Sequence, residues 1–80
     1  MAKQQQVTIY STPTCHFCHM AKDFFSANHV MFTDYNVATD LEKRREMVQK
    51  SGQMGVPVIT IDNKVIVGYD EEQLKQTLGL

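Results

Sequence analysis

The alternation of strand and helix patterns along the first 37 residues is the feature that most constrains the fold. Residues 7–10 alternate β-branched and aromatic side chains, which is typical of a short strand. Apolar residues then recur at helical spacing between residues 15 and 28, where Asn28 suits a left-handed cap, and residues 32–37 again have the composition of a strand. This order predicts two parallel strands joined by a right-handed crossover.

A second helix is expected to begin at residues 39–42. Thr39 and Glu42 have the spacing of a capping box, in which the hydroxyl and the carboxylate bind free N–H groups of the helix. The helix is expected to end at Ser51-Gly52, because glycine is the usual residue just beyond a helix. The apolar side chains expected to face the core are Leu41, Met47 and Val48.

The last third of the chain predicts a hairpin and a third helix. Residues 58–61 and 65–67 are apolar runs separated by a polar turn at 62–64, and residues 70–73 can cap a final helix. The complete order is β-α-β-α-β-β-α. We therefore predict an α/β fold with a four-stranded mixed sheet and three helices. Residues 1–80 are expected to form a single domain, of which residues 1–6 are a polar N-terminal tail.

Length and charge exclude several classes of function. Eighty residues are near the lower limit of a chain that folds alone. A net charge of −1 creates no basic surface for nucleic acid, and no apolar run approaches the ~18 residues that span a membrane. The N-terminus lacks the apolar segment of a secretory signal, so we expect the protein in the reducing cytoplasm. We also expect it to be a monomer. A cysteine pair in that compartment is more often catalytic or metal-binding than structural.

Cys15 and Cys18 form a C-x-x-C motif at the start of the first expected helix. Their spacing puts both thiols on one helical face, close enough to form a disulfide after a small adjustment. Cys15 meets the free N–H groups and the positive end of the helix dipole, so we expect its pKa to be lowered, with His16 as the candidate cation that helps. Cys18 is expected to be more buried. This asymmetry predicts that Cys15 attacks a target disulfide and that Cys18 resolves the mixed disulfide.

Two other chemistries fit residues 15–19. The motif C-x-x-C-H attaches a c-type haem, for which His19 and Met54 would be the axial ligands. The β-rich segments and the missing export signal argue against this interpretation. A structural zinc site needs four ligands, yet both thiols lie in one short segment. We expect no metal site within the chain and no tightly bound cofactor, whereas an iron–sulfur cluster bridged between two chains stays open.

Three segments in order resemble the glutaredoxins, and more narrowly the small glutaredoxin-like redoxins. They are Cys15-x-x-Cys18 after a strand, Gly55-Val56-Pro57 before a strand, and Gly68-Tyr69-Asp70 before the last helix. The resemblance covers residues 7–78 and implies a minimal thioredoxin fold. It implies a thiol–disulfide oxidoreductase that reduces protein or glutathione mixed disulfides. It also implies a cis proline facing the dithiol, and an acidic residue near the amino group of glutathione.

The same resemblance implies a set of residues that bind substrate or glutathione. These are Thr12, Phe17, Val56, Pro57, Gly68, Tyr69 and Asp70. The chain departs from the common pattern because C-P-Y-C is replaced by C-H-F-C, and Thr12 stands where a lysine commonly holds a glutathione carboxylate. Some family members that supply electrons to ribonucleotide reductase are themselves reduced by thioredoxin reductase. Glutathione and thioredoxin reductase are therefore the alternative electron sources, and disulfide-containing proteins are the expected substrates.

Overall fold

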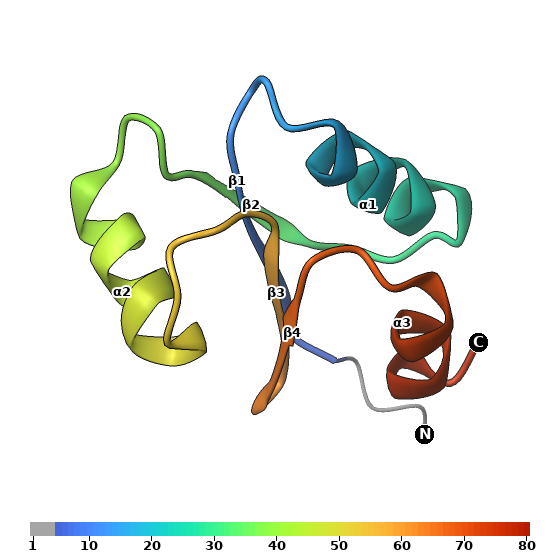
Figure 1. Cartoon of the computed structure of the whole chain (residues 1–80). Helices are drawn as coiled ribbons and strands as arrows, with labels where there is room; N and C mark the ends of the chain where they lie inside the picture. Colours follow the sequence, from blue (N-terminus) through green and yellow to red (C-terminus); the bar gives the residue numbers. More distant parts are fainter. Residues whose placement is uncertain (1–4) are drawn as a thin grey trace.

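Four strands form one mixed sheet between two layers of helices in the computed structural model, which describes residues 5–80 (Figure 1). The strands are β1 (Val7–Ser11), β2 (Thr33–Asn36), β3 (Val58–Ile61) and β4 (Lys64–Val67). The helices are α1 (His16–Ala27), α2 (Leu41–Ser51) and α3 (Glu71–Leu78). In the sheet order β2-β1-β3-β4, β1 is parallel to β2, and the pairs β1–β3 and β3–β4 are antiparallel. This arrangement confirms the predicted thioredoxin fold.

Helices α1 and α3 cover one face of the sheet, and α2 covers the other (Figure 1). Because successive side chains of a strand point to opposite faces, neighbouring residues of β1 belong to different cores. Ile9 packs in the cluster that contains Phe25 of α1 and Leu74 of α3, whereas Tyr10 packs with Met47 of α2. All four residues of β3 are buried, as expected for a central strand covered on both sides. No helix in residues 5–80 has the length and apolar character needed to cross a bilayer.

The start of α2 differs from the predicted capping box. Asp40, not Thr39, is the N-cap, and its Oδ1 accepts a hydrogen bond from the backbone N–H of Lys43 at 3.1 Å. The Thr39 hydroxyl instead donates to the Asn36 carbonyl in the preceding turn. Leu41, predicted to face the core, is 63% exposed. It precedes Met47 by six residues, which puts it about 120° around the helix from the side that faces the sheet.

Two other element ends are displaced from the prediction. At the end of α1, Asn28 keeps a negative φ of −103°, and its side chain donates to the Phe24 carbonyl. The left-handed residue is therefore His29, with φ 57°. The hairpin turn is shorter than predicted because β4 begins at Lys64, where its partner in β3 is Ile61. Gly52 ends α2 in the left-handed conformation, as predicted.

A polar network anchors α2 to the sheet. The Tyr10 hydroxyl in β1 donates to Glu46 Oε2 of α2 at 2.6 Å, and Lys43 Nζ lies 3.5 Å from the same oxygen. The Lys43 ammonium also lies 4.3 Å from the centre of the Tyr35 ring. The hydrogen bond from Tyr10 lowers the pKa of Glu46 below its usual range, and the charge of Lys43 adds to this against the opposing effect of burial. Burial, followed by the bond to Glu46, raises the pKa of Tyr10.

The Tyr10→Phe variant should lose about 1.5 to 3 kcal/mol of stability at neutral pH, because it removes a hydrogen bond to a charged acceptor. Since the pKa of Glu46 is lower in the folded protein, its contribution is present at neutral pH. That contribution is lost as the pH falls from about 5 through the lowered value. The gap between wild type and variant should therefore shrink on acidification. Urea unfolding between neutral pH and pH 3 measures it, and a constant gap would contradict the coupling.

Candidate active site

The sheet register brings the three segments that the sequence singled out to one edge. Tyr10 in β1 pairs with Val58 in β3, and Val58 pairs with Val67 in β4. The end of β1, the start of β3 and the end of β4 therefore lie together, as the antiparallel order requires (Figure 1). The backbone N–H of Gly68 donates to the Pro57 carbonyl at 2.8 Å, which ties two of these segments directly.

Cys15 and Cys18 form a disulfide at the N-terminus of α1, with their Cα atoms 5.2 Å apart. Cys15 is the N-cap residue, and its Sγ accepts a hydrogen bond from the backbone N–H of Cys18 at 3.1 Å. The first turn of α1 contains no acidic residue that would oppose negative charge on this sulfur. Cys15 is partly exposed, whereas Cys18 has no exposed surface, as predicted. The Cys15 sulfur can therefore contact a substrate, whereas the Cys18 sulfur is shielded from it.

His19 holds the turn that precedes Cys15, a role that the sequence did not reveal. Its ring Nε2 lies 2.8 Å from the Pro13 carbonyl, where it donates a hydrogen bond. Its backbone N–H donates to the Cys15 carbonyl at 3.2 Å, and the Cys15 N–H donates to the Thr12 carbonyl at 3.3 Å. These hydrogen bonds link the turn at residues 12–14 to the first turn of α1 and fix the backbone before and after Cys15. The C-x-x-C-H spacing that suggests haem attachment is the signal that could have pointed to this residue.

The His19→Ala variant should react more slowly with disulfides, by about threefold to tenfold, because the Pro13 carbonyl loses its donor and the turn gains freedom. His19→Gln keeps a side-chain donor and should recover part of the rate. The measurement is the rate of thiol alkylation of the reduced protein against pH, together with the rate of disulfide reduction. Profiles identical to wild type in both variants would remove His19 from the positioning of the site.

The variable residues of the motif lie on the surface. His16 and Phe17 are both exposed, and their rings pack edge to face with centres 5.6 Å apart. Phe17 is 56% exposed, so it presents an apolar ring beside the disulfide. Thr12 is half-buried in the turn before Cys15. Effects of His16 on the thiolate and of Thr12 and Phe17 on substrate binding remain predictions.

The two other segments supply backbone and one carboxylate. The Val56–Pro57 peptide bond is cis, as the resemblance implies, and Pro57 is buried. Gly68 has φ 82°, a conformation that glycine adopts without steric cost. The Tyr69 ring packs against Phe24 of α1, and burial followed by the charge of Glu71 raises its pKa.

Asp70 is exposed at the end of this edge and caps α3. Its Oδ1 accepts a hydrogen bond from the backbone N–H of Gln73 at 3.2 Å. Capping uses this one oxygen, so the carboxylate can also meet a ligand.

Metal coordination was the competing chemistry for the thiols. In the described part of the chain, no three His, Cys, Asp or Glu side chains are grouped so that they could hold an ion.

Comparisons with known proteins agree with this geometry. The family model of glutaredoxins matches residues 7–66. A glutaredoxin-like 8.6 kDa protein from Clostridium pasteurianum is 42% identical over 72 residues, which cover 90% of this chain and 96% of that protein. Glutaredoxin 3 of Escherichia coli is 40% identical over 65 residues, which cover 81% and 78% of the two chains. The glutaredoxin-like protein NrdH of Lactococcus lactis is 32% identical over 71 residues, with 85% and 93% coverage.

The solved structures give the same result. The glutaredoxin of Archaeoglobus fulgidus superposes with a TM-score of 0.85 at 25% identity, covering 92% of this chain and 86% of its own. The matched family segment contains both cysteines and the cis proline. The chain belongs to the glutaredoxin family, and its Cys15–Cys18 pair is the redox centre of a thiol–disulfide oxidoreductase.

Proposed function

We propose that this protein reduces protein disulfides and glutathione mixed disulfides, with Cys15 as the nucleophile and Cys18 as the resolving thiol. The observation that carries the proposal is the unequal exposure of the two cysteines: Cys15 at the N-cap of α1 is partly exposed, whereas Cys18 in the first turn is buried. The Cys15 thiolate attacks a target sulfur, the target S–S bond breaks, and the leaving thiolate takes up a proton. Cys18 then loses its proton, attacks the Cys15 sulfur and releases the second target thiol. Two electrons have passed from the dithiol to the target.

The surrounding residues suit an extended substrate segment. Val56 lies just before β3, where its backbone can pair with a segment that is added as a short strand. The hydrogen bond from the Gly68 N–H to the Pro57 carbonyl ties this backbone to the end of β4 at the dithiol edge. We assign Thr12, Phe17 and Tyr69 to the rim that contacts the substrate or glutathione. This assignment follows from their places in the three segments of the site.

We propose glutathione as the electron source, taken as a co-substrate and not as a tightly bound cofactor. The open oxygen of Asp70 can receive the amino group of glutathione, and the Gly68 turn leaves room for its backbone. Glutaredoxin 3 is among the relatives of this chain. Two glutathione molecules would reduce the Cys15–Cys18 disulfide and leave as glutathione disulfide. This chemistry makes the protein an electron carrier of a reducing compartment such as the cytoplasm.

Thioredoxin reductase is the second candidate, and the observation that favours it is Thr12. A neutral residue at this position lacks the charge that holds a glutathione carboxylate in many family members. One of the relatives is an NrdH protein. The test uses NADPH consumption with a glutathione–cysteine mixed disulfide, in parallel reactions with glutathione and glutathione reductase or with thioredoxin reductase alone. Turnover only with thioredoxin reductase would identify this enzyme as the electron source in place of glutathione. Turnover in neither reaction would overturn both assignments of the electron source.

The His16→Pro variant should form its Cys15 thiolate at higher pH and be less oxidising, because the imidazole side chain and the backbone N–H of His16 at the helix N-terminus are lost. The Phe17→Tyr variant changes the neighbouring ring without changing charge, and it should behave like wild type. The measurements are the pH dependence of thiol alkylation and the equilibrium with a glutathione redox buffer. No difference between His16→Pro and wild type in either measurement would remove the assigned role of His16.

A further inference from the structure

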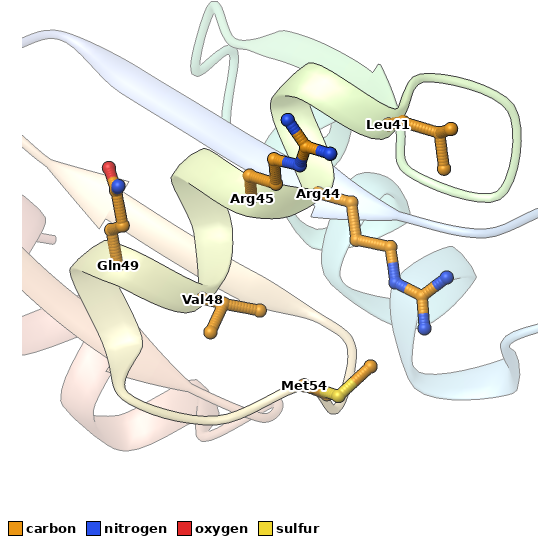
Figure 2. Close-up of a pocket in the computed structure, with 6 residues that line it drawn as sticks. All are labelled: Leu41, Arg44, Arg45, Val48, Gln49 and Met54. Atoms are coloured by element: carbon orange, nitrogen blue, oxygen red, sulfur yellow. The ribbon is translucent and has the colours of Figure 1, made fainter.

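The side of α2 that carries Leu41 forms a pocket of about 440 Å³ with the loop that leads to β3 (Figure 2). Its lining is mostly carbon, and the residues are Leu41, Arg44, Arg45, Val48, Gln49 and Met54. Positions 41, 44, 45 and 48 recur at helical spacing and so share one side of the helix. Besides the side that buries Met47 against the sheet, α2 thus has a second, open apolar side.

Apolar side chains are exposed to an unusual degree in this pocket. Leu41 is 63% exposed and Met54 is 60% exposed, while Val48 is half-buried between them and the sheet. A single exposed apolar side chain is ordinary, but several in one hollow are typical of an interaction surface. The sequence interpretation placed Leu41 in the core because it did not detect this second side.

The loop wall of the pocket is held by its own hydrogen bonds. The Gly55 N–H donates to Gln53 Oε1 at 2.6 Å, and Gln53 Nε2 donates to the Gly55 carbonyl at 3.0 Å. The backbone N–H of Gln53 donates to the Ser51 Oγ at 3.3 Å, which ties the loop to the last residue of α2. A partner would therefore meet a largely preformed surface and lose little free energy in ordering it.

Two cations flank the apolar lining. Arg44 and Arg45 both line the pocket, and in Figure 2 their side chains extend from α2 in different directions. Among residues 5–80, the acidic side chains in ion pairs are held by Lys22, Lys43 and Lys75, so both guanidinium groups are open to an outside carboxylate. Charge complementarity therefore requires an occupant with an apolar side chain and an acidic neighbour.

The loop that forms one wall of the pocket leads directly into the segment assigned to the substrate. Met54 lies only two residues before Val56, whose backbone is assigned to the substrate segment. A polypeptide that pairs with Val56 can thus extend over the pocket, whereas a small mixed disulfide has no aliphatic side chain to fill it. The occupant that fits is a stretch of the protein substrate itself.

We propose that this pocket is a docking site for disulfide-bearing protein substrates. It takes an aliphatic side chain with an adjacent Asp or Glu, from the segment near the target cysteine. The identity of the partner as a disulfide substrate rests on the proposed function, but the apolar and acidic chemistry of its segment rests on the pocket alone.

The test compares two sets of short peptides, each with one cysteine in a disulfide with thionitrobenzoate, which becomes coloured when it is released. The first set has Leu followed by Glu at varied distances from the cysteine, and the second has Ser followed by Gln at the same places. Reduced protein attacks the peptide sulfur, thionitrobenzoate leaves, and Cys18 then frees the peptide thiol. At least one Leu-Glu peptide should react about tenfold faster than its Ser-Gln counterpart. In the Leu41→Gln variant the two peptides should react at the same rate. In the Arg45→Glu variant the ratio of the two rates should fall about threefold at low salt.

Lys64→Glu and Leu80→Ser are the matched controls, since both residues are exposed and lie outside the pocket. Both controls should keep the wild-type ratio. A ratio near one in the wild type, or an unchanged ratio in Leu41→Gln, would overturn the docking site.

A second measurement separates docking from chemistry. Oxidised, isotope-labelled protein is titrated with the same peptides carrying serine in place of cysteine. Amide resonance shifts that include the pocket residues within 41–56 would support docking even if no disulfide were reduced, and that combination would overturn the proposed function alone. Shifts that leave out the pocket residues, or no shifts at all, would overturn docking. Shifts at residues 41–56 that depend on protein concentration without peptide would assign the pocket to self-association and also overturn it.

Discussion

The Cys15→Ser variant is expected to lose disulfide reduction almost completely, by a factor on the order of 10³ or more. The partly exposed Cys15 sulfur is the atom that reaches a substrate, and a serine hydroxyl remains protonated where a thiol ionises. The hydrogen bond from the Cys18 N–H to the Cys15 sulfur and the helix N-terminus stabilise negative charge at this position. The measurement is NADPH consumption with a protein disulfide as substrate, under whichever reductant supports turnover.

The Cys18→Ser variant is the matched control because it changes the same atom type three residues away. It should still make the first attack and then accumulate a mixed disulfide between Cys15 and the substrate, which mass spectrometry of the acid-quenched mixture detects. It should lose reduction of protein disulfides that need a resolving thiol, yet retain glutathione-dependent turnover of small mixed disulfides. A mixed disulfide that formed on Cys18 in the Cys15→Ser protein would reverse the assigned roles.

The element order could be predicted because it follows from periodicity. Strands need an alternating or fully apolar run and helices need a spacing of three to four residues, so the change of period at residue 15 and again at residue 32 marks the elements. Right-handed crossover and the hairpin then leave few ways to order the strands. Since the two hydrophobic cores lie on opposite faces of the sheet, the neighbouring residues Ile9 and Tyr10 pack against different helices.

The details that could not be predicted depend on competition between neighbouring groups. Thr39 and Asp40 are both good caps, and the tight turn after β2 takes the Thr39 hydroxyl for the Asn36 carbonyl. Leu41 was expected to face the core because it is apolar, yet its separation of six residues from Met47 puts it about 120° around the helix. A window of eleven residues with mixed charges has too weak a hydrophobic pattern to correct this error.

The site was predictable to the extent that it follows from topology and motif. A motif after β1, before β3 or after β4 must lie at the same edge of this sheet, so the dithiol, Pro57 and Gly68 meet there. The cis conformation of the Val56–Pro57 bond came only from family resemblance, because the sequence permits either isomer. The contact of His19 with the Pro13 carbonyl depends on the path of an irregular turn, for which the sequence carries no periodic signal.

The Phe25→Ala variant is expected to lose about 3 to 5 kcal/mol of stability. Phe25 has no exposed surface, and its ring lies between the sheet-facing side of α1 and the Phe32 ring, with centres 5.3 Å apart. An 80-residue chain has a total stability of roughly 4 to 12 kcal/mol, so this substitution should remove about a quarter of it or more. The measurement is urea unfolding by circular dichroism, with Phe17→Ala as the control. Phe17 is 56% exposed, and its removal should change stability by less than about 0.5 kcal/mol.

The loss in Phe25→Ala should be the same for the oxidised and the reduced protein. The Cys15–Cys18 disulfide closes a loop within the N-terminal turn of α1, whereas Phe25 holds the second half of the helix on the sheet. The bridge therefore cannot replace the lost packing, and it adds little restriction to the unfolded chain because its loop is so short. A loss below about 1 kcal/mol would show that the helix is docked by other residues. A loss confined to the reduced form would show that the bridge and the Phe25 ring stabilise the same contact between α1 and the sheet.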